Sequence, residues 1–526
     1  MRRVSRREVC VAMLAAAPAF KGLTALADDP KAQLKFGPPF EFGYEALVDR
    51  AREMATTGFV PAPSIASEIV EKIDYDAHGK LRFKSEAALF ADGSGTYPAT
   101  FFHIGRYFQR GVRMNVLRDG LASEIRYAPD LFEMPADSVA RDLPSNVGFA
   151  GFRFQESLKR DDWKTQDWLA FLGASYWRAI GDDGQYGLSA RGVAIDSATP
   201  KPEEFPEFRE FYLTPATREG EPSVVLALLD GPSITGAFRF SIRRTKAVTI
   251  DVEARLFLRK DVERLGIAPV TSMYWYGENA VGLGDDWRPE IHDSDGLAIQ
   301  TGRGERIWRP LVNPRQPTVS AFVDENPKGF SLVQRDRDFE HYLDGVNYDR
   351  RPSLWIEPLG DWGRGSVQLM ELRTDDEVHD NIGAFWVPEA PAQAGGSYTF
   401  RYRQHWVSGI PEFPKSLAQC VSTRTGRAGR PGQDHPEDAR KFVVEFEGPV
   451  LAALETDAEV EAIVETSVGR VDDVFAERVP GTKRWRFLFD LYEDATQPSD
   501  LRGLLRGGNG VLTETWIYRH DPVPRT

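Results

Sequence analysis

The sequence predicts a mainly β protein built from β-sandwich domains with a few helices. Apolar and polar residues alternate with period two over residues 248–258, which is typical of a half-buried antiparallel strand. The same alternation recurs at residues 238–242, 398–402, 442–446 and 485–489. The 46 glycines and 35 prolines supply the turns that many short strands need. We therefore expect sheets packed face to face rather than a helical or α/β architecture.

The N-terminus has the three parts of an export signal. Ser5-Arg6-Arg7-Glu8-Val9 is followed by an apolar run over residues 9–20 and by the small-residue sequence Ala25-Leu26-Ala27. Paired arginines, a short apolar segment and an A-x-A site are typical of a twin-arginine signal peptide. We expect residues 1–27 to be removed and the mature chain to begin near Asp28 in the periplasm.

Further along the chain, the pattern predicts one helix, many strands and a linker. Apolar residues at helical spacing predict a helix over residues 44–55, with Gly58 as its stop. Residues 101–117 are expected to be rich in strand. A Pro/Gly-rich stretch at 408–436 has little apolar periodicity, and we assign 408–420 as the linker. Domains are predicted at 28–407 and 421–526, the second having the size of an immunoglobulin-like sandwich.

Charge and composition exclude several classes of partner. Loss of the signal peptide removes five basic residues and one acidic residue, so the formal charge moves from -14 to about -18. An acidic surface of this kind argues against nucleic acid as a partner. No run approaches the ~20 apolar residues of a membrane-spanning helix, so stable membrane insertion is not expected. Cys10 and Cys420 are the two cysteines, and without Cys10 no intrachain disulfide can form.

Known cofactor and nucleophile motifs are missing from the sequence. There is no phosphate-binding G-x-x-x-x-G-K-[ST], no G-x-G-x-x-G and no G-x-S-x-G elbow. His292-Asp293-Ser294-Asp295 resembles a ligand cluster, but adjacent residues on a strand face opposite ways, and no H-x-H, C-x-x-C or H-E-x-x-H spacing supports it. We therefore expect no cofactor and no metal.

The stretch from residue 287 to 310 is the densest in chemically informative residues. It contains two Arg-Pro pairs, two tryptophans, one histidine and a Gly-rich hairpin signal. If the segment is extended, Ile291, Asp293 and Asp295 share one face and His292 the other. A second His-Asp pair follows at His379-Asp380, and we expect the two acidic centres to meet across one cleft.

Tryptophans gather in and around this stretch. Sugar rings stack on aromatic faces and bind carboxylates, amides and arginines through their hydroxyls, so a glycan site should be rich in both. A set of tryptophans closing the core of a sandwich is the alternative interpretation. Besides the tryptophans, His292 and Arg309 are candidate sugar contacts. Six of the 12 tryptophans lie here: Trp275, Trp287, Trp308, Trp355, Trp362 and Trp386.

Several sequence strings resemble a known family. They are FGYEAL from Phe42, FLGASYWRAIG from Phe171, QYGLSARGVAID from Gln185, RPEIHDSDGL from Arg288, ERIWRPLVNP from Glu305 and ETWIYR from Glu514. Together they resemble the periplasmic glucan biosynthesis proteins G and D (OpgG/OpgD, also MdoG/MdoD) over the whole mature chain. The twin-arginine signal is similar to the D branch.

The resemblance implies a fold and an activity. It implies a large N-terminal β-sandwich of galactose-mutarotase-like type and a C-terminal immunoglobulin-like domain. It also implies action on a β-1,2-glucan backbone by an inverting glycoside hydrolase or transglycosylase. On the matching motifs, Asp380 is the general acid and Asp293 the general base, while Tyr348 and Glu377 order the site around the sugar. This sequence departs from the family by His379 before the acid.

Two functional hypotheses stay open at this point. In the first, Asp293 and Asp380 cleave or transfer β-1,2-glucan, with Tyr348, Glu377, His292, Arg309, Trp308 and Trp355 as substrate contacts. In the second, the chain is a non-catalytic glucan-binding protein that controls backbone structure. A purely structural assembly is a third interpretation. A homodimer is the one assembly of several chains that we consider.

Overall fold

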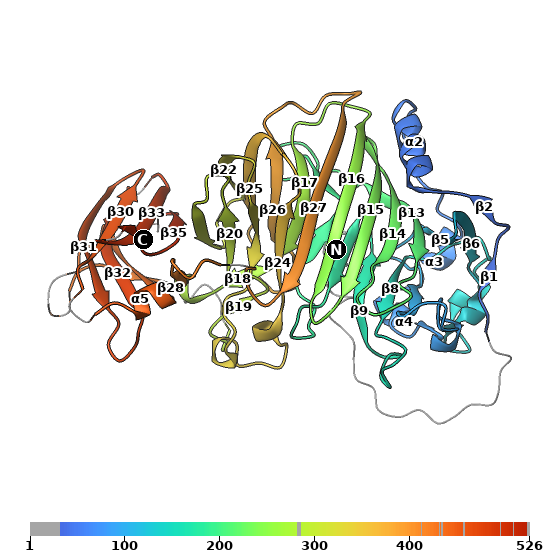
Figure 1. Cartoon of the computed structure of the whole chain (residues 1–526), viewed down its shortest axis with the longest axis horizontal. Coiled ribbons are helices and arrows are strands. Elements are labelled where there is room, and N and C mark those ends of the chain that lie inside the picture. The colour runs from blue at the N-terminus through green and yellow to red at the C-terminus, as the bar shows by residue number, and fades with distance from the viewer. Residues whose placement is uncertain are drawn as a thin grey trace. The chain divides into compact units, whose positions relative to one another are not determined.

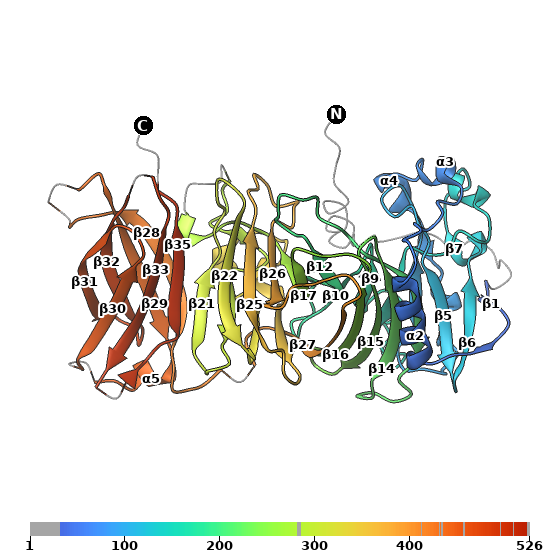
Figure 2. The same ribbon diagram turned by 90° about the horizontal axis from the view of Figure 1, so that it is seen from above.

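The computed structural model describes residues 32–280, 286–411, 413–430, 432, 435–455, 458–494, 496–508 and 510–522 (Figures 1 and 2). The predicted signal peptide at 1–27 lies outside these residues. Strands predominate over helices throughout, so the predicted mainly β fold is confirmed. Among the described residues, no helix is both long and apolar enough to cross a membrane.

The chain forms two compact units. The first contains the described residues up to Val270 together with Pro358–Gly365 and Phe385–Trp406. The second contains Thr271–Glu357, Ser366–Ala384 and the described residues from Val407 onward. Residues 28–407 thus contribute to both units. The predicted domain boundaries and linker stay a prediction.

A twisted sheet of long strands forms one layer of the first unit (Figure 1). The alternating segment at 248–258 is a strand with its apolar side chains buried on one face, as predicted. Strands β13, β14, β15, β16 and β27 pair antiparallel in this order, and β5 pairs with β13 in parallel. The strands are β5 (Arg113–Arg118), β6 (Leu121–Arg126), β13 (Glu207–Thr214), β14 (Ser223–Asp230), β15 (Ile234–Arg244), β16 (Val248–Leu258) and β27 (Ser397–Val407), with the short β1 (Lys35–Phe36) and β2 (Phe40–Glu41) on β6.

The predicted helix packs on this sheet. Helix α2 (Tyr44–Ala55) ends three residues before Gly58 and buries Leu47, Val48 and Ala51. These side chains join Leu226 and Leu228 of β14 in one apolar cluster, because positions i, i+1 and i+4 fall on the same face of a helix. The helix prediction is therefore confirmed in both extent and buried face.

A second layer completes the sandwich of the first unit. Phe152 and Phe171 of this layer lie 5.1 Å and 5.2 Å, between ring centroids, from Phe211 and Phe240 of the long-stranded sheet. Such edge-to-face contacts between two sheets form a sandwich core. The second layer contains β4 (Ala99–Phe102), β8 (Gly151–Gln155), β9 (Asp167–Leu172), β10 (Tyr176–Ala179), β11 (Ser189–Arg191), β12 (Val193–Ile195) and β17 (Leu265–Ser272). Short elements nearby are α3 (Ser67–Val70), α4 (Tyr75–His78), β3 (Arg82–Phe83), η1 (Ser85–Ala87), η2 (Pro129–Leu131), β7 (Phe132–Glu133) and η3 (Val139–Asp142).

The second unit contains another pair of sheets, drawn mainly in yellow and red in Figure 2. One sheet has the order β30-β33-β35-β21-β20-β23, in which β35 runs parallel to β21. The other has the order β28-β29-β32-β31. The first sheet consists of β20 (Gly296–Gln300), β21 (Arg306–Pro310), β23 (Gly329–Val333), β30 (Val460–Thr466), β33 (Ser499–Gly507) and β35 (Thr515–His520). The second consists of β28 (Gln419–Arg427), β29 (Ala439–Glu447), β31 (Arg470–Arg478) and β32 (Trp485–Tyr492).

One aromatic core joins these two sheets. It contains Phe442, Phe487 and Trp516, and also Trp308 of β21 and Trp355 of β24 (Ser353–Pro358). The remaining elements of this part of the chain are β18 (Tyr274–Tyr276), η4 (Glu278–Ala280), β19 (Ile291–His292), β22 (Thr318–Glu325), η5 (Phe339–His341), η6 (Tyr348–Arg350), β25 (Arg364–Glu371), β26 (Ile382–Pro388), α5 (Pro449–Ala452) and β34 (Gly510–Val511).

Candidate functional site

Asp293 lies where the chain leaves a short strand of the second unit. Strand β19 ends at His292, which pairs with Tyr274 of β18. The N–H of Asp293 then donates to the carbonyl oxygen of Met273 at 2.8 Å, and Asp293 is 2 % exposed. The expectation of one extended segment from Ile291 to Asp295 is wrong, because residues 293–295 interrupt the strand before β20 begins at Gly296. Asp293 therefore lies just beyond the regular strand, with its N–H held by this backbone bond.

Asp380 is held in place by the residue that follows it. The side-chain Oδ1 of Asn381 accepts from the N–H of Tyr274 at 2.9 Å, and its Nδ2 donates to the carbonyl oxygens of Tyr274 at 2.9 Å and Leu372 at 2.8 Å. An amide that satisfies three backbone groups leaves the chain at this point little freedom. Asp380 itself is 7 % exposed.

The segments that carry Asp293 and Asp380 bind the same peptide unit. Asp293 bonds to the carbonyl of Met273 and Asn381 to the N–H of Tyr274, and these two groups belong to the same trans peptide. The C=O and N–H of a trans peptide point in opposite directions. The two segments therefore approach the Met273–Tyr274 peptide from opposite sides, one through the N–H of Asp293 and the other through the side chain of Asn381.

Tyr348 and Glu377 belong to a charged network that reaches Asp293. The Tyr348 hydroxyl donates to Glu377 Oε2 at 2.6 Å, and Arg288 donates to the same oxygen at 2.9 Å. The Arg351 guanidinium lies 4.0 Å from the centroid of the Tyr348 ring, and its Nη1 donates to Asp293 Oδ1. The structure thus connects Asp293, Tyr348 and Glu377 through Arg288 and Arg351, two arginines to which the sequence analysis gave no role.

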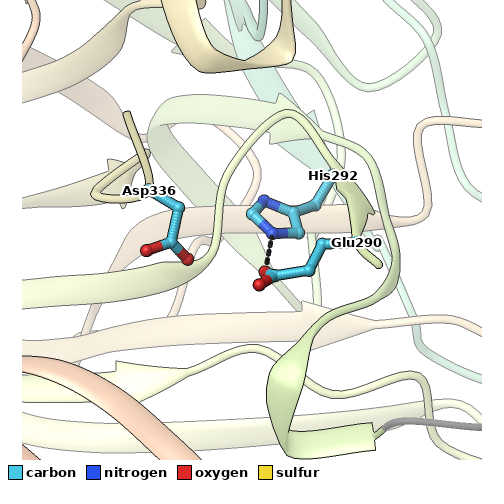
Figure 3. A group of neighbouring side chains, drawn as sticks. All are labelled: Glu290, His292 and Asp336. Atoms are coloured by element: carbon cyan, nitrogen blue, oxygen red, sulfur yellow. Dashed lines mark hydrogen bonds and ion pairs between the residues drawn. The ribbon is translucent and has the colours of Figure 1, made fainter. Parts of the chain in front are cut away.

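His292 faces away from this network into a buried cluster. It is 0 % exposed, and its Nε2 lies 3.0 Å from Glu290 Oε2 (Figure 3). The other oxygen of Glu290 lies 2.7 Å from His341 Nδ1. Burial opposes ionisation, but the hydrogen bonds from His292 and His341 lower the pKa of Glu290 to about 2. The bond to Glu290 raises the pKa of His341 to about 9.

Further carboxylates adjoin the same cluster. Burial and the neighbouring charge of Glu290 raise the pKa of Glu278 to about 7. Burial, with the charges of Asp295, Glu278 and Glu290, raises the pKa of Asp336 well above its usual range. A small cavity of about 20 Å³ is lined in part by Glu278, Asp295 and Asp336. The cluster is therefore a site where protons or a cation must balance an excess of negative charge.

Three predicted sugar contacts lie in the core instead. Trp308 and Trp355 are 4 % and 5 % exposed within the aromatic core of the second unit. Each ring lies directly against a glycine, Gly296 for Trp308 and Gly329 for Trp355, where a Cβ would come within 2.2 Å of the ring. Arg309 is 1 % exposed and donates to Glu371 at 3.0 Å. These three side chains are therefore too buried to contact a sugar at the surface.

One of the six tryptophans, Trp287, is exposed and directly precedes an arginine of the charged network. Trp287 is 70 % exposed and precedes Arg288, which binds Glu377. Composition alone could not separate this ring from the buried tryptophans. Spacing could have revealed Glu290, since Glu290-x-His292 places both side chains on one face of an extended segment.

The fold and the site define a mainly β protein whose second unit holds buried acids, histidines and arginines around a candidate carboxylate pair. Comparison with known proteins gives the family: residues 42–520 match the family described as "Periplasmic glucan biosynthesis protein, MdoG", and the chain belongs to it. The description of this family implies a periplasmic location.

Similar proteins cover nearly the whole chain. The sequence is 52 % identical over 522 residues to glucans biosynthesis protein D 2 of Ralstonia nicotianae, covering 97 % of each chain. It is 45 % identical over 494 residues to glucans biosynthesis protein D of Stenotrophomonas maltophilia, covering 93 % of this chain and 92 % of the relative. The corresponding protein of Xanthomonas axonopodis pv. citri is 45 % identical over 496 residues, with the same coverage.

Proposed function

We propose that this protein acts on β-1,2-glucan as an inverting glycoside hydrolase or transglycosylase. Asp380 is the general acid and Asp293 the general base. The observation that carries the proposal is the placement of these two residues on either side of the Met273–Tyr274 peptide. We expect the carboxyl groups of Asp293 and Asp380 to be ~6.5–9.5 Å apart, the separation that leaves room for a nucleophile in inverting enzymes.

The reaction needs one proton to be delivered and one to be removed. Asp380 gives its proton to the leaving glycosidic oxygen as the bond to the anomeric carbon breaks. A water molecule or a sugar hydroxyl attacks that carbon from the opposite face and loses its proton to Asp293. A water nucleophile gives hydrolysis, and a sugar hydroxyl gives transfer.

The charged network has a defined part in this proposal. The guanidinium of Arg351 favours the ionised form of Asp293, which is the form that a general base needs. Tyr348 and Glu377 tie the segment that carries Arg351 to Arg288. These contacts support the orientation of Asp293 relative to the sugar.

The same ion pair favours the second candidate function, glucan binding without chemistry. A carboxylate already engaged by an arginine is a weaker proton acceptor than a free one. On this alternative the chain holds glucan through the exposed Trp287 and the charged network and leaves its bonds intact.

Replacing Asp380 by Asn separates the two functions. The change keeps size and hydrogen-bonding capacity but removes the transferable proton. Turnover of linear β-1,2-glucan should fall by about 10²–10⁴-fold while glucan affinity stays within several-fold. Asp375→Asn is the matched control, since the Asp375 side chain is 81 % exposed in the same segment, and it should leave turnover unchanged. Normal turnover by the Asp380→Asn variant would leave the binding function as the better account.

Export by the twin-arginine route is part of the proposal. Changing Arg6 and Arg7 together to Lys should leave the precursor in the cytoplasm, because the paired guanidinium groups are read by the export receptor and Lys lacks their planar fork. Fractionation of cells that express the wild type and the variant tests this. Equal periplasmic yield would contradict it.

A further inference from the structure

Glu290, His292 and Asp336 present their polar atoms to one buried space. One ligand-type atom from each lies within 4.8 Å of the others, and Figure 3 shows the three polar ends turned toward one another. Glu290 and His292 are 4 % and 0 % exposed, and the Asp336 side chain is 12 % exposed. Two carboxylates and one imidazole at this spacing form a set of three metal ligands.

Gln334, which is not one of the three ligands, determines the tautomer of His292. The Nε2 of Gln334 donates to the carbonyl oxygens of His292 at 3.0 Å and Tyr348 at 3.2 Å, and both of these groups can only accept. The Oε1 of Gln334 must then be the atom that faces His292 Nδ1 at 2.9 Å, so this nitrogen carries a hydrogen and donates it.

With Nδ1 as the donor to Gln334, the other ring nitrogen of His292, Nε2, is left to face Glu290. In the neutral ring, His292 Nε2 has a lone pair directed at the carboxylate of Glu290, 3.0 Å away. Two lone pairs at that distance repel each other unless a proton or a cation lies between them. A histidine whose second nitrogen donates to a fixed acceptor is the usual arrangement of a metal ligand.

Carboxylates are the main groups around this space. Four carboxylates, those of Glu278, Glu290, Asp295 and Asp336, face the two imidazoles of His292 and His341. Arg335, whose N–H donates to Asp295, has its guanidinium engaged by Glu514 at 2.6 Å and 3.1 Å. The carboxylates of this group therefore outnumber its imidazoles, and carboxylate oxygens are ligands that a divalent cation binds.

There is room beside the cluster for a further ligand. The cavity of about 20 Å³ that Asp336 lines is large enough for one water molecule. Within the described part of the chain, the buried Asp295 Oδ1 and Ser422 Oγ, whose residues line this cavity, have no hydrogen-bond partner. Ser422 is 6 % exposed, so an unsatisfied hydroxyl here indicates that something polar occupies the cavity.

We propose that Glu290, His292 and Asp336 bind one Zn²⁺ ion, with a water from the adjoining cavity as the fourth ligand. One nitrogen and two oxygen donors suit zinc, whereas calcium and magnesium prefer oxygen alone. Asp336 begins the segment that leads to Tyr348 and Arg351, so the ion ties this segment to strand β19. The sequence led to the opposite expectation because Asp336 lies far from the Glu-x-His pair along the chain.

Direct binding tests this proposal without any glucan assay. The full-length mature protein is stripped with a chelator and titrated with Zn²⁺ alone by calorimetry, and Co²⁺ is used as a spectroscopic substitute. We expect one site per chain, a rise in Tm on loading and Co²⁺ bands of a four-coordinate ion. Glu290→Gln and Asp336→Asn should each weaken Zn²⁺ binding by at least ~10²-fold, while the exposed control Asp375→Asn leaves it unchanged.

A crystal of the wild-type protein provides a second measurement that does not depend on how the variants fold. Anomalous scattering at the zinc edge should give one peak among Glu290, His292 and Asp336. Absence of stoichiometric binding at micromolar Zn²⁺ would overturn the proposal, as would a peak at other residues or equal loss of binding in Asp375→Asn.

Discussion

Trp308 and Asp293 lie in the same unit and in the same short stretch of sequence, but the structure gives them opposite environments. Trp308 packs on Gly296 inside an aromatic core. Asp293 is buried among charges, in contact with Arg351 and near Tyr348. The difference shows that density of aromatic and acidic residues along a chain locates a region of interest but does not assign roles within it.

The largest effect that distinguishes these two environments is on stability. Trp308→Ala should lower the free energy of unfolding by about 3–5 kcal/mol, because it leaves a cavity over Gly296. Denaturant titration of both proteins measures this. Unchanged stability together with lost glucan affinity would instead make Trp308 a sugar contact, as the sequence predicted.

The second effect is on the pH dependence of stability, which the charged cluster should show and the aromatic core should not. The folded-state pKa of His341 is raised to about 9 by Glu290, so its contribution to stability is complete below about pH 6.5 and is lost as pH rises through 9. In chelator-treated protein the loss should be about 1–2 kcal/mol, after allowance for solvent screening at a side chain that is 32 % exposed. His341→Gln should remove this dependence, measured as unfolding free energy against pH. An unchanged slope in the variant would show that His341 does not carry the effect.

A smaller effect is expected at the exposed ring. Trp287→Ala should weaken binding of β-1,2-glucan by about 0.5–1.5 kcal/mol, the size of one aromatic contact, and leave the unfolding free energy almost unchanged because the side chain is 70 % exposed. Calorimetry with the glucan and thermal melting give the two values. Loss of stability without loss of affinity would contradict this.

Local pattern predicted the fold well because period and propensity act over short distances. The helix at 44–55 and the strand at 248–258 follow from the spacing of their apolar residues, and both are confirmed. The break in the strand after His292 could not be predicted in this way, since β19 ends where its pairing with the separate strand β18 ends. Tertiary pairing of this kind overrides local alternation.

Residues of the candidate site could be named from the sequence only where a motif resembled the family and thereby implied a role. Asp293, Tyr348 and Glu377 were named from matching motifs, and the structure joins them through Arg288 and Arg351. Neither arginine could be identified from spacing, because each contacts partners more than 50 residues away in sequence. The buried tryptophans could not be distinguished from Trp287 without knowledge of which rings face a glycine in the core.

If the chain breaks or transfers β-1,2 linkages with inversion, the configuration of the first product shows this directly. Purified mature protein is incubated with linear β-1,2-glucan, and the products are followed by mass and by NMR of the newly formed anomeric centre. The account predicts shorter or rearranged chains, and in hydrolysis a new reducing end that is first observed as the α-anomer. Glucan recovered unchanged at saturating protein, or a new end first observed as the β-anomer, would contradict it.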